Sequence, residues 1–127
     1  MITALYAGLS GVLLLALSSR VVNERRTHEV GIGDGGQPDL MRAIRVQANF
    51  TEYVPTILIL ILLVEMNGNS ATVVHSLGTA LLVSRVLHAA GLSRSSGIST
   101  ARFVGILGTW MVLAIASAIL LMDAIPG

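Results

Sequence analysis

The sequence predicts an all-α integral membrane protein built as a bundle of four transmembrane helices. Of its 127 residues, 54% are apolar and only 12% are charged, and the mean hydropathy is +0.80. A soluble domain carries about 25% charged residues, so this chain has about half the charge that an aqueous surface needs. One span needs about 20 apolar residues. The length therefore allows about four spans in a single transmembrane domain over residues 1–127, and it excludes a large extramembrane catalytic domain.

The predicted helices cover about 2–28, 39–65, 71–92 and 101–124. The first apolar run has no basic residue ahead of it, so it lacks the positive region of a cleavable signal peptide and is expected to be retained. The glycine-rich stretch 31–38 is typical of a loop, and Pro38 followed by Asp39 is typical of a helix start. Turn residues at 67–70 and 93–97 separate the remaining helices.

The basic residues predict the orientation in the membrane. All eight are Arg, and each lies at an end of a helix that borders the first or the third connection: Arg20, Arg25, Arg26, Arg42, Arg45, Arg85, Arg94 and Arg102. Connections between four spans alternate sides, so these two connections share a side. The positive-inside rule places both in the cytoplasm and both termini outside it.

Small residues predict where the helices meet. Lipid removes the hydrophobic incentive for helix contact, so residues that permit close van der Waals approach are favoured at helix interfaces. We expect such contacts at six glycines, which are Gly8, Gly11, Gly78, Gly91, Gly105 and Gly108.

A polar face is predicted on the second helix, directly before the apolar block 54–64. At about 100° per residue, five polar residues fall on one side of this helix: Arg42, Arg45, Asn49, Glu52 and Tyr53. Anchoring at lipid phosphates also explains the two Arg, and a purely structural ion pair also explains Glu52. The whole face reaches deeper than anchoring requires, and ionisable residues inside a membrane mark functional sites. Gln47 falls on a different side.

The histidines predict no metal site. Arg85 and His88 are three residues apart on the third helix and are therefore neighbours on its surface; His88 fits a packing role and a site role equally. His28 and His75 lie elsewhere, and no two histidines stand four residues apart beside carboxylates, so we assign no metal. The chain has no Cys, and any thiol chemistry must come from a substrate.

The polar groups predict the class of ligand. Several guanidinium groups, one carboxylate, and amide or hydroxyl donors complement a small molecule that carries both carboxylates and an ammonium group. Glutathione has two carboxylates, one ammonium and a thiol, and it matches these groups one by one. A phosphorylated lipid head group is equally compatible with this composition.

The second helix carries a resemblance to a known family. Its segment 42–55, Arg-Ala-Ile-Arg-Val-Gln-Ala-Asn-Phe-Thr-Glu-Tyr-Val-Pro, is similar to the pattern Arg-Ala-x-Arg-x-x-x-Asn-x-x-Glu-Tyr-x-Pro of the membrane-associated proteins in eicosanoid and glutathione metabolism (the MAPEG family). The chain resembles a bacterial-type member over its whole length, with supporting matches at Arg25-Arg26, Arg85, His88 and Arg102. This resemblance implies a left-handed four-helix bundle, assembled as a homotrimer in a bacterial inner membrane. It also implies glutathione as a co-substrate bound between neighbouring subunits.

The same resemblance implies roles for individual residues. The matched glutathione contacts on the second helix are Arg45, Asn49, Glu52 and Tyr53. Arg25 matches a contact from the first helix of the neighbouring subunit, and His88 lies where family members carry His or Tyr close to glutathione. Arg102 best matches the Arg that holds the thiolate and is the predicted catalytic residue, with Arg26 as the next candidate.

The sequence therefore predicts a glutathione transferase or peroxidase that attacks a small lipophilic electrophile dissolved in the membrane lipid. Leu92 and Phe103 replace a Tyr of the eicosanoid synthases and a Ser of the prostaglandin-forming members, which argues against those specialised reactions. A non-catalytic ligand-binding or scaffold member of the same fold is the main alternative. A small multidrug exporter would need an ionisable residue deep in the bilayer, and residues 2–19 are uncharged. Nothing predicts a nucleic-acid partner.

Overall fold

The computed structural model describes residues 1–94, 97 and 99–125, without the side chains of residues 92–94. Four helices make up the structure: α1 (Thr3–His28), α2 (Pro38–Met66), α3 (Ala71–Arg94) and α4 (Thr100–Ala124). All four are long and apolar enough to cross a membrane. Their bounds lie within two residues of the predicted ones, so the all-α, four-span prediction is confirmed. The left-handed sense and the trimer stay predictions, and the side chains of Leu92 and Arg94 lie outside the described part.

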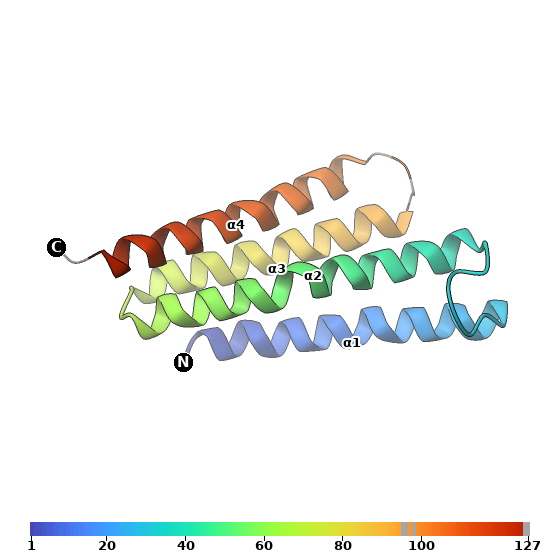
Figure 1. Cartoon of the computed structure of the whole chain (residues 1–127), viewed down its shortest axis with the longest axis horizontal. Helices are drawn as coiled ribbons and strands as arrows, with labels where there is room; N and C mark the ends of the chain where they lie inside the picture. The colour runs from blue at the N-terminus through green and yellow to red at the C-terminus, as the bar shows by residue number, and fades with distance from the viewer. Residues whose placement is uncertain (95–96, 98, 126–127) are drawn as a thin grey trace.

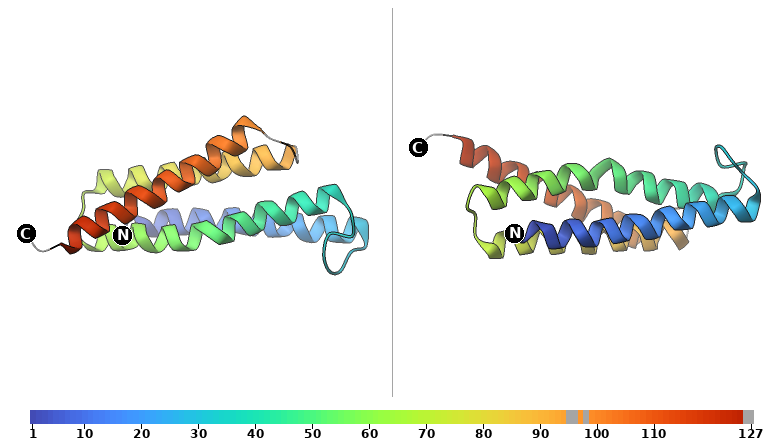
Figure 2. Two further views of the ribbon diagram at one scale, coloured as in Figure 1. Left: turned by 45° about the horizontal axis from the view of Figure 1, so that its top comes forward. Right: turned by 90° about the horizontal axis from the view of Figure 1, so that it is seen from below.

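The helices run up and down, each antiparallel to the next. The α1–α2 and α3–α4 connections share one end of the bundle, while the start of α1, the α2–α3 connection and the end of α4 share the other (Figure 1). Two further views show that α4 crosses the bundle obliquely (Figure 2). The helices α2 and α3 contact each other and also contact both outer helices, whereas α1 and α4 do not contact one another in the described chain. The helix ends that carry the Arg residues therefore lie together.

Among the described residues, the helix α2 contributes more of the buried hydrophobic core than any other helix. Its buried residues recur every three or four positions from Leu40 to Val64 and pack against α1, α3 and α4. This spacing forms one continuous apolar stripe on a helix. The helix begins at Pro38, where a missing N–H costs nothing, and Asp39 adds a favourable negative charge in the first turn. Pro55 lies inside the helix, so the carbonyl of Thr51 has no backbone N–H partner one turn later.

The end of α2 also caps the start of α1. The α1 helix has no side-chain cap of its own, although the first backbone N–H groups of any helix lack intrahelical partners. The Glu65 carboxylate accepts hydrogen bonds from the backbone nitrogens of Ile2 and Thr3 at 2.5 and 2.7 Å. A carboxylate at this position also complements the positive end of the helix dipole. Glu65 therefore holds the first and second helices in register at the end opposite the Arg residues.

Glycines allow α3 and α4 to approach closely. A Cβ atom added at Gly91 would meet the Arg102 backbone, and one at Gly105 would meet the carbonyl oxygen of Ser84 at 2.7 Å. Gly108 packs on the Ser84 side chain, and Gly78 packs on the Tyr6 ring. The packing prediction holds at these four glycines. It is wrong within one chain for the two remaining glycines on α1, Gly8 and Gly11, because both face open space.

Candidate functional site

The polar residues of α2 lie beside its buried stripe. Arg42, Asn49 and Tyr53 are half-buried, whereas the side chains of Arg45 and Glu52 are 54% and 49% exposed. The Arg45 Nη2 and Glu52 Oε1 atoms are 3.7 Å apart, which is longer than a charge-assisted hydrogen bond of about 2.7–2.9 Å. The two exposed charges thus form a loose pair on the outer side of the helix.

A buried arginine on α3 stands behind this face. Arg85 is only 1% exposed, and its Nη2 donates to Asn49 Oδ1 at 2.7 Å. Its Nη1 contacts Thr109 Oγ1 on α4 at 3.4 Å, and its guanidinium lies over the Phe50 ring at 5.8 Å from the centroid. Its Nε has no hydrogen-bond partner. The sequence analysis placed Arg85 beside His88 and used it as a supporting match but gave it no role, although an Arg within an apolar helix was itself a signal.

His88 joins the same cluster. The residue is 4% exposed, and its Nδ1 lies 3.3 Å from Arg85 Nη2. Arg85, Arg102 and Arg45 lie close enough for their positive charges to act on His88, and the Glu52 carboxylate acts on Arg85. The structure therefore brings charged residues of α2, α3 and α4 within electrostatic reach of Arg85 and His88.

Arg102 lies in the first turn of α4. Ser99 caps this helix by accepting a hydrogen bond from the Arg102 backbone nitrogen at 3.2 Å. The half-buried Arg102 side chain borders a hollow of about 350 Å³, together with Ser99, Ile106 and the exposed Phe103. A helix N-terminus and an Arg side chain both favour an anion here.

Arg25 and Arg26, in the last turn of α1, stand apart from this cluster. Arg25 donates to the backbone carbonyls of Val30 and Gly33 at 3.3 and 2.9 Å, so it holds the α1–α2 loop. Arg26 lies on the outer side of α1, where it borders a hollow of about 440 Å³ with Ser19 and Asn23 among its neighbours. Within the described part of one chain, no hydrogen bond or ion pair joins either Arg to the cluster on α2, α3 and α4.

Comparison with known proteins identifies the family. Residues 3–122, which include the α2 polar face, Arg85, His88 and Arg102, match the MAPEG family. The chain belongs to the MAPEG family. It is 40% identical over 113 residues to the inner membrane protein YecN of Escherichia coli strain K12, covering 89% of this chain and 85% of YecN. The YecN protein of Escherichia coli O6:H1 gives the same identity and coverage. The predicted family is therefore confirmed.

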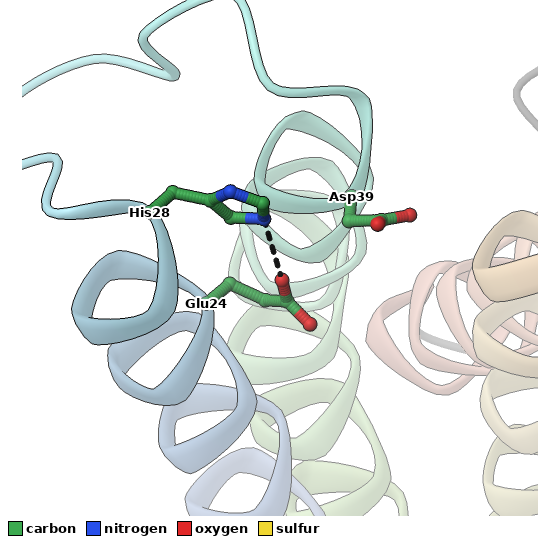
Figure 3. Close-up of side chains that lie close together, drawn as sticks. All are labelled: Glu24, His28 and Asp39. Atoms are coloured by element: carbon green, nitrogen blue, oxygen red, sulfur yellow. Dashed lines mark ion pairs between the residues drawn. The ribbon is translucent and has the colours of Figure 1, made fainter.

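This MAPEG chain has a second charged cluster at the α1–α2 connection (Figure 3). Glu24, His28 and Asp39 bring their donor atoms within 4.8 Å of one another. His28 Nε2 lies 3.4 Å from Glu24 Oε2, one helical turn away, and Asp39 forms an ion pair with Arg42. Sequence reasoning considered pairs of histidines and missed this His–carboxylate pair, since only the loop brings Asp39 beside it. Both carboxylates already have basic partners, so we describe the group as an ion-pair cluster.

The remaining histidine of this MAPEG protein lies near the opposite end of the bundle. Tyr6 Oη lies 2.8 Å from His75 Nδ1 and 3.0 Å from Thr79 Oγ1, and it also donates to the His75 carbonyl at 3.1 Å. These contacts tie α1 to α3 beside Gly78. His75 thus has a packing role between these two helices.

Proposed function

We propose that this MAPEG protein is a multi-pass inner-membrane enzyme that binds glutathione and activates its thiol for attack on a lipophilic electrophile, as a transferase or peroxidase. The observation that carries the proposal is a cluster from three helices: Arg85 contacts Asn49 and His88, the charges of Arg45 and Arg102 reach His88, and Glu52 forms a loose pair with Arg45. Family membership supports it, and the naming of the YecN relatives as inner membrane proteins supports the location.

The loose Arg45–Glu52 pair suits a ligand that carries both charges. Its 3.7 Å separation leaves neither group fully satisfied, and both are accessible from outside the chain. A glutathione carboxylate would accept hydrogen bonds from the Arg45 guanidinium, and the glutathione ammonium would donate to Glu52. Binding would replace one weak ion pair with two charge-assisted hydrogen bonds to the ligand.

Arg102 is the proposed catalytic residue. A free thiol of this kind has a pKa of about 8.5, so only a few per cent is thiolate at neutral pH. A guanidinium at the start of α4 favours the charged form and lowers that thiol pKa. The thiol proton leaves to water, and the sulfur then forms a bond to the electrophilic carbon while the leaving group departs with its electron pair.

An apolar hollow supports a lipophilic electrophile. The space of about 450 Å³ between α3 and α4 has Gly108, Val112 and Ile115 among its lining residues. It begins about 9 Å along α4 from Arg102, at about 1.5 Å per residue. The end of the hollow at Gly108 is the part nearest Arg102, so an acceptor that extends from this end toward the thiolate would be held beside it, which adds to the rate.

A homotrimer with shared sites completes the proposal. The exposed charges of Arg45 and Glu52 would face lipid in a single chain, where a charge at depth costs about 3 kcal/mol or more. A neighbouring subunit would cover them, and its α1 would supply Arg25 or Arg26, which do not reach the cluster within one chain. Light scattering in mild detergent tests the assembly, and a uniform monomer would contradict it. With both termini outside the cytoplasm, the site would open to cytosolic glutathione.

Calorimetric titration of the detergent-purified protein with glutathione and with its S-hexyl derivative tests the binding step. Conjugation of glutathione to a chlorinated aromatic acceptor tests the chemistry. Heat from neither ligand would refute the glutathione site. Binding without conjugation or peroxide reduction would favour the non-catalytic ligand-binding alternative.

A further inference from the structure

Arg85 has no evident role in contacting a ligand, because its side chain is 1% exposed. A guanidinium group carries only hydrogen-bond donors and never loses its charge under ordinary conditions. Its Nη2 nevertheless contacts two site residues, Asn49 and His88. The side chain of each carries both a hydrogen-bond donor and an acceptor, so each could face Arg85 with either one. Because Arg85 can only donate, the acceptor atom of each side chain must face it.

The contact with Asn49 orients the amide. Since Arg85 can only donate, the amide atom at 2.7 Å must be the oxygen, Oδ1. The amide nitrogen, Nδ2, then points away from Arg85, and within the described residues it has no hydrogen-bond partner. Asn49 therefore offers two N–H donors to whatever occupies the site.

The contact with His88 selects a tautomer. The Nδ1 atom lies 3.3 Å from Arg85 Nη2 and must accept a hydrogen bond from it. An accepting Nδ1 carries no proton, so the proton of the neutral ring resides on Nε2. A charged imidazolium would bring two N–H donors and two positive charges together at this distance, which is unfavourable.

We propose that Arg85 is a positioning residue that sets the hydrogen-bonding direction of the site, fixing Asn49 and His88 as donors. The ligand is named as glutathione on the strength of the proposed function; the orientation itself does not depend on it. In this arrangement His88 donates through Nε2 to a ligand carboxylate or thiolate. It does not remove the thiol proton, since its accepting nitrogen is occupied by Arg85.

Nitrogen NMR on detergent-solubilised protein with isotope-labelled histidine tests the tautomer without any ligand. The chain has only 3 His, and His88→Gln assigns the signal. At neutral pH we expect one tautomer of His88, with the proton on Nε2. In Arg85→Met, which lacks the donor, we expect the second tautomer to appear, whereas Arg85→Lys should restore the single one. A protonated Nδ1 in the unaltered protein would overturn the proposal, even if no variant folds.

Glutathione titration tests the orientation of Asn49. Asn49→Asp keeps an oxygen for Arg85 but replaces the outward N–H donors with an oxygen that repels carboxylates, so we expect affinity to fall about tenfold or more. The matched control is Gln47→Glu, the same change on the same helix. Its Nε2 donates to Ser18 on α1 at 2.8 Å, away from the site, and we expect a change within about twofold.

The two proposals fail in different ways. If the unaltered protein does not bind glutathione, the proposed function is wrong, while the His88 tautomer still decides the role of Arg85. If it binds glutathione and Asn49→Asp binds equally well, the proposed function survives and the donor orientation is refuted.

Discussion

Replacement of Arg45 by Leu separates ligand binding from folding. The Arg45 side chain is 54% exposed, and its distance to Glu52 is 3.7 Å, so the pair contributes about 0–1 kcal/mol to folding. A charge-assisted hydrogen bond from Arg45 to a glutathione carboxylate is worth about 1.5–3 kcal/mol. A loss of about 1.4 kcal/mol in binding free energy corresponds to a tenfold rise in Kd. Because the site is half open to solvent, we expect the lower part of that range, a rise in Kd of about tenfold.

Calorimetric titration with glutathione measures this change, and thermal unfolding in the same detergent checks that the fold is intact. Arg42→Leu is the matched control, because it removes the same charge one turn earlier on α2, from a residue that pairs with Asp39. We expect its Kd to stay within about threefold, from the general loss of positive potential. Equal losses in both variants would show that only the overall charge matters. No loss in either would make the α2 face structural.

Three further predictions concern the thiolate, the packing and the topology. Arg102→Leu should leave glutathione affinity within about threefold but raise the pKa of the bound thiol by about 1–3 pH units. Ultraviolet absorbance of the thiolate, measured against pH, reports this pKa. An unchanged titration would remove Arg102 from the mechanism and make Arg26 the next candidate. Gly105→Ala should destabilise the protein by about 1–3 kcal/mol, because the added Cβ would lie 2.7 Å from the Ser84 carbonyl oxygen. Gly8→Ala is the control and should not destabilise it, because Gly8 faces open space. Equal melting temperatures for the two variants would contradict the close α3–α4 contact. A reporter fused after Gly127 should be extracytoplasmic and one inserted near Gly35 cytoplasmic, and the reverse result would place the Arg cluster away from cytosolic glutathione.

The helices and the polar face of α2 were accessible to sequence reasoning because both depend on local patterns. A span needs only a sufficiently long apolar run, and turn residues mark its ends. The angular positions of Arg45, Asn49 and Glu52 follow from the helical repeat alone. The structure adds a gradient across this face, from half-buried Asn49 to exposed Arg45 and Glu52, because only the packing decides which side of the face borders the core.

The partners of the contacts between helices were not accessible in this way. Gly105 packs closely and Gly8 does not, although both are small residues in apolar helices. Glu65 appeared in the sequence only as the end of a span, yet it caps α1 at Thr3, 62 positions earlier in the chain. In each case the partner lies on another helix, and no local pattern names it.

The sequence by itself determined that this chain crosses a membrane with four helices, that its Arg residues share one end, and that it belongs to the MAPEG family. Those properties depend on composition, on the helical repeat and on a motif within a single helix. Only the tertiary structure decided that Arg85, a neighbour of His88 on α3, lies buried against Asn49 of α2 and Thr109 of α4. The reason is physical. The helical repeat fixes where a side chain lies around the axis of its own helix, whereas the packing and rotation of the helices decide which side chains of different helices meet.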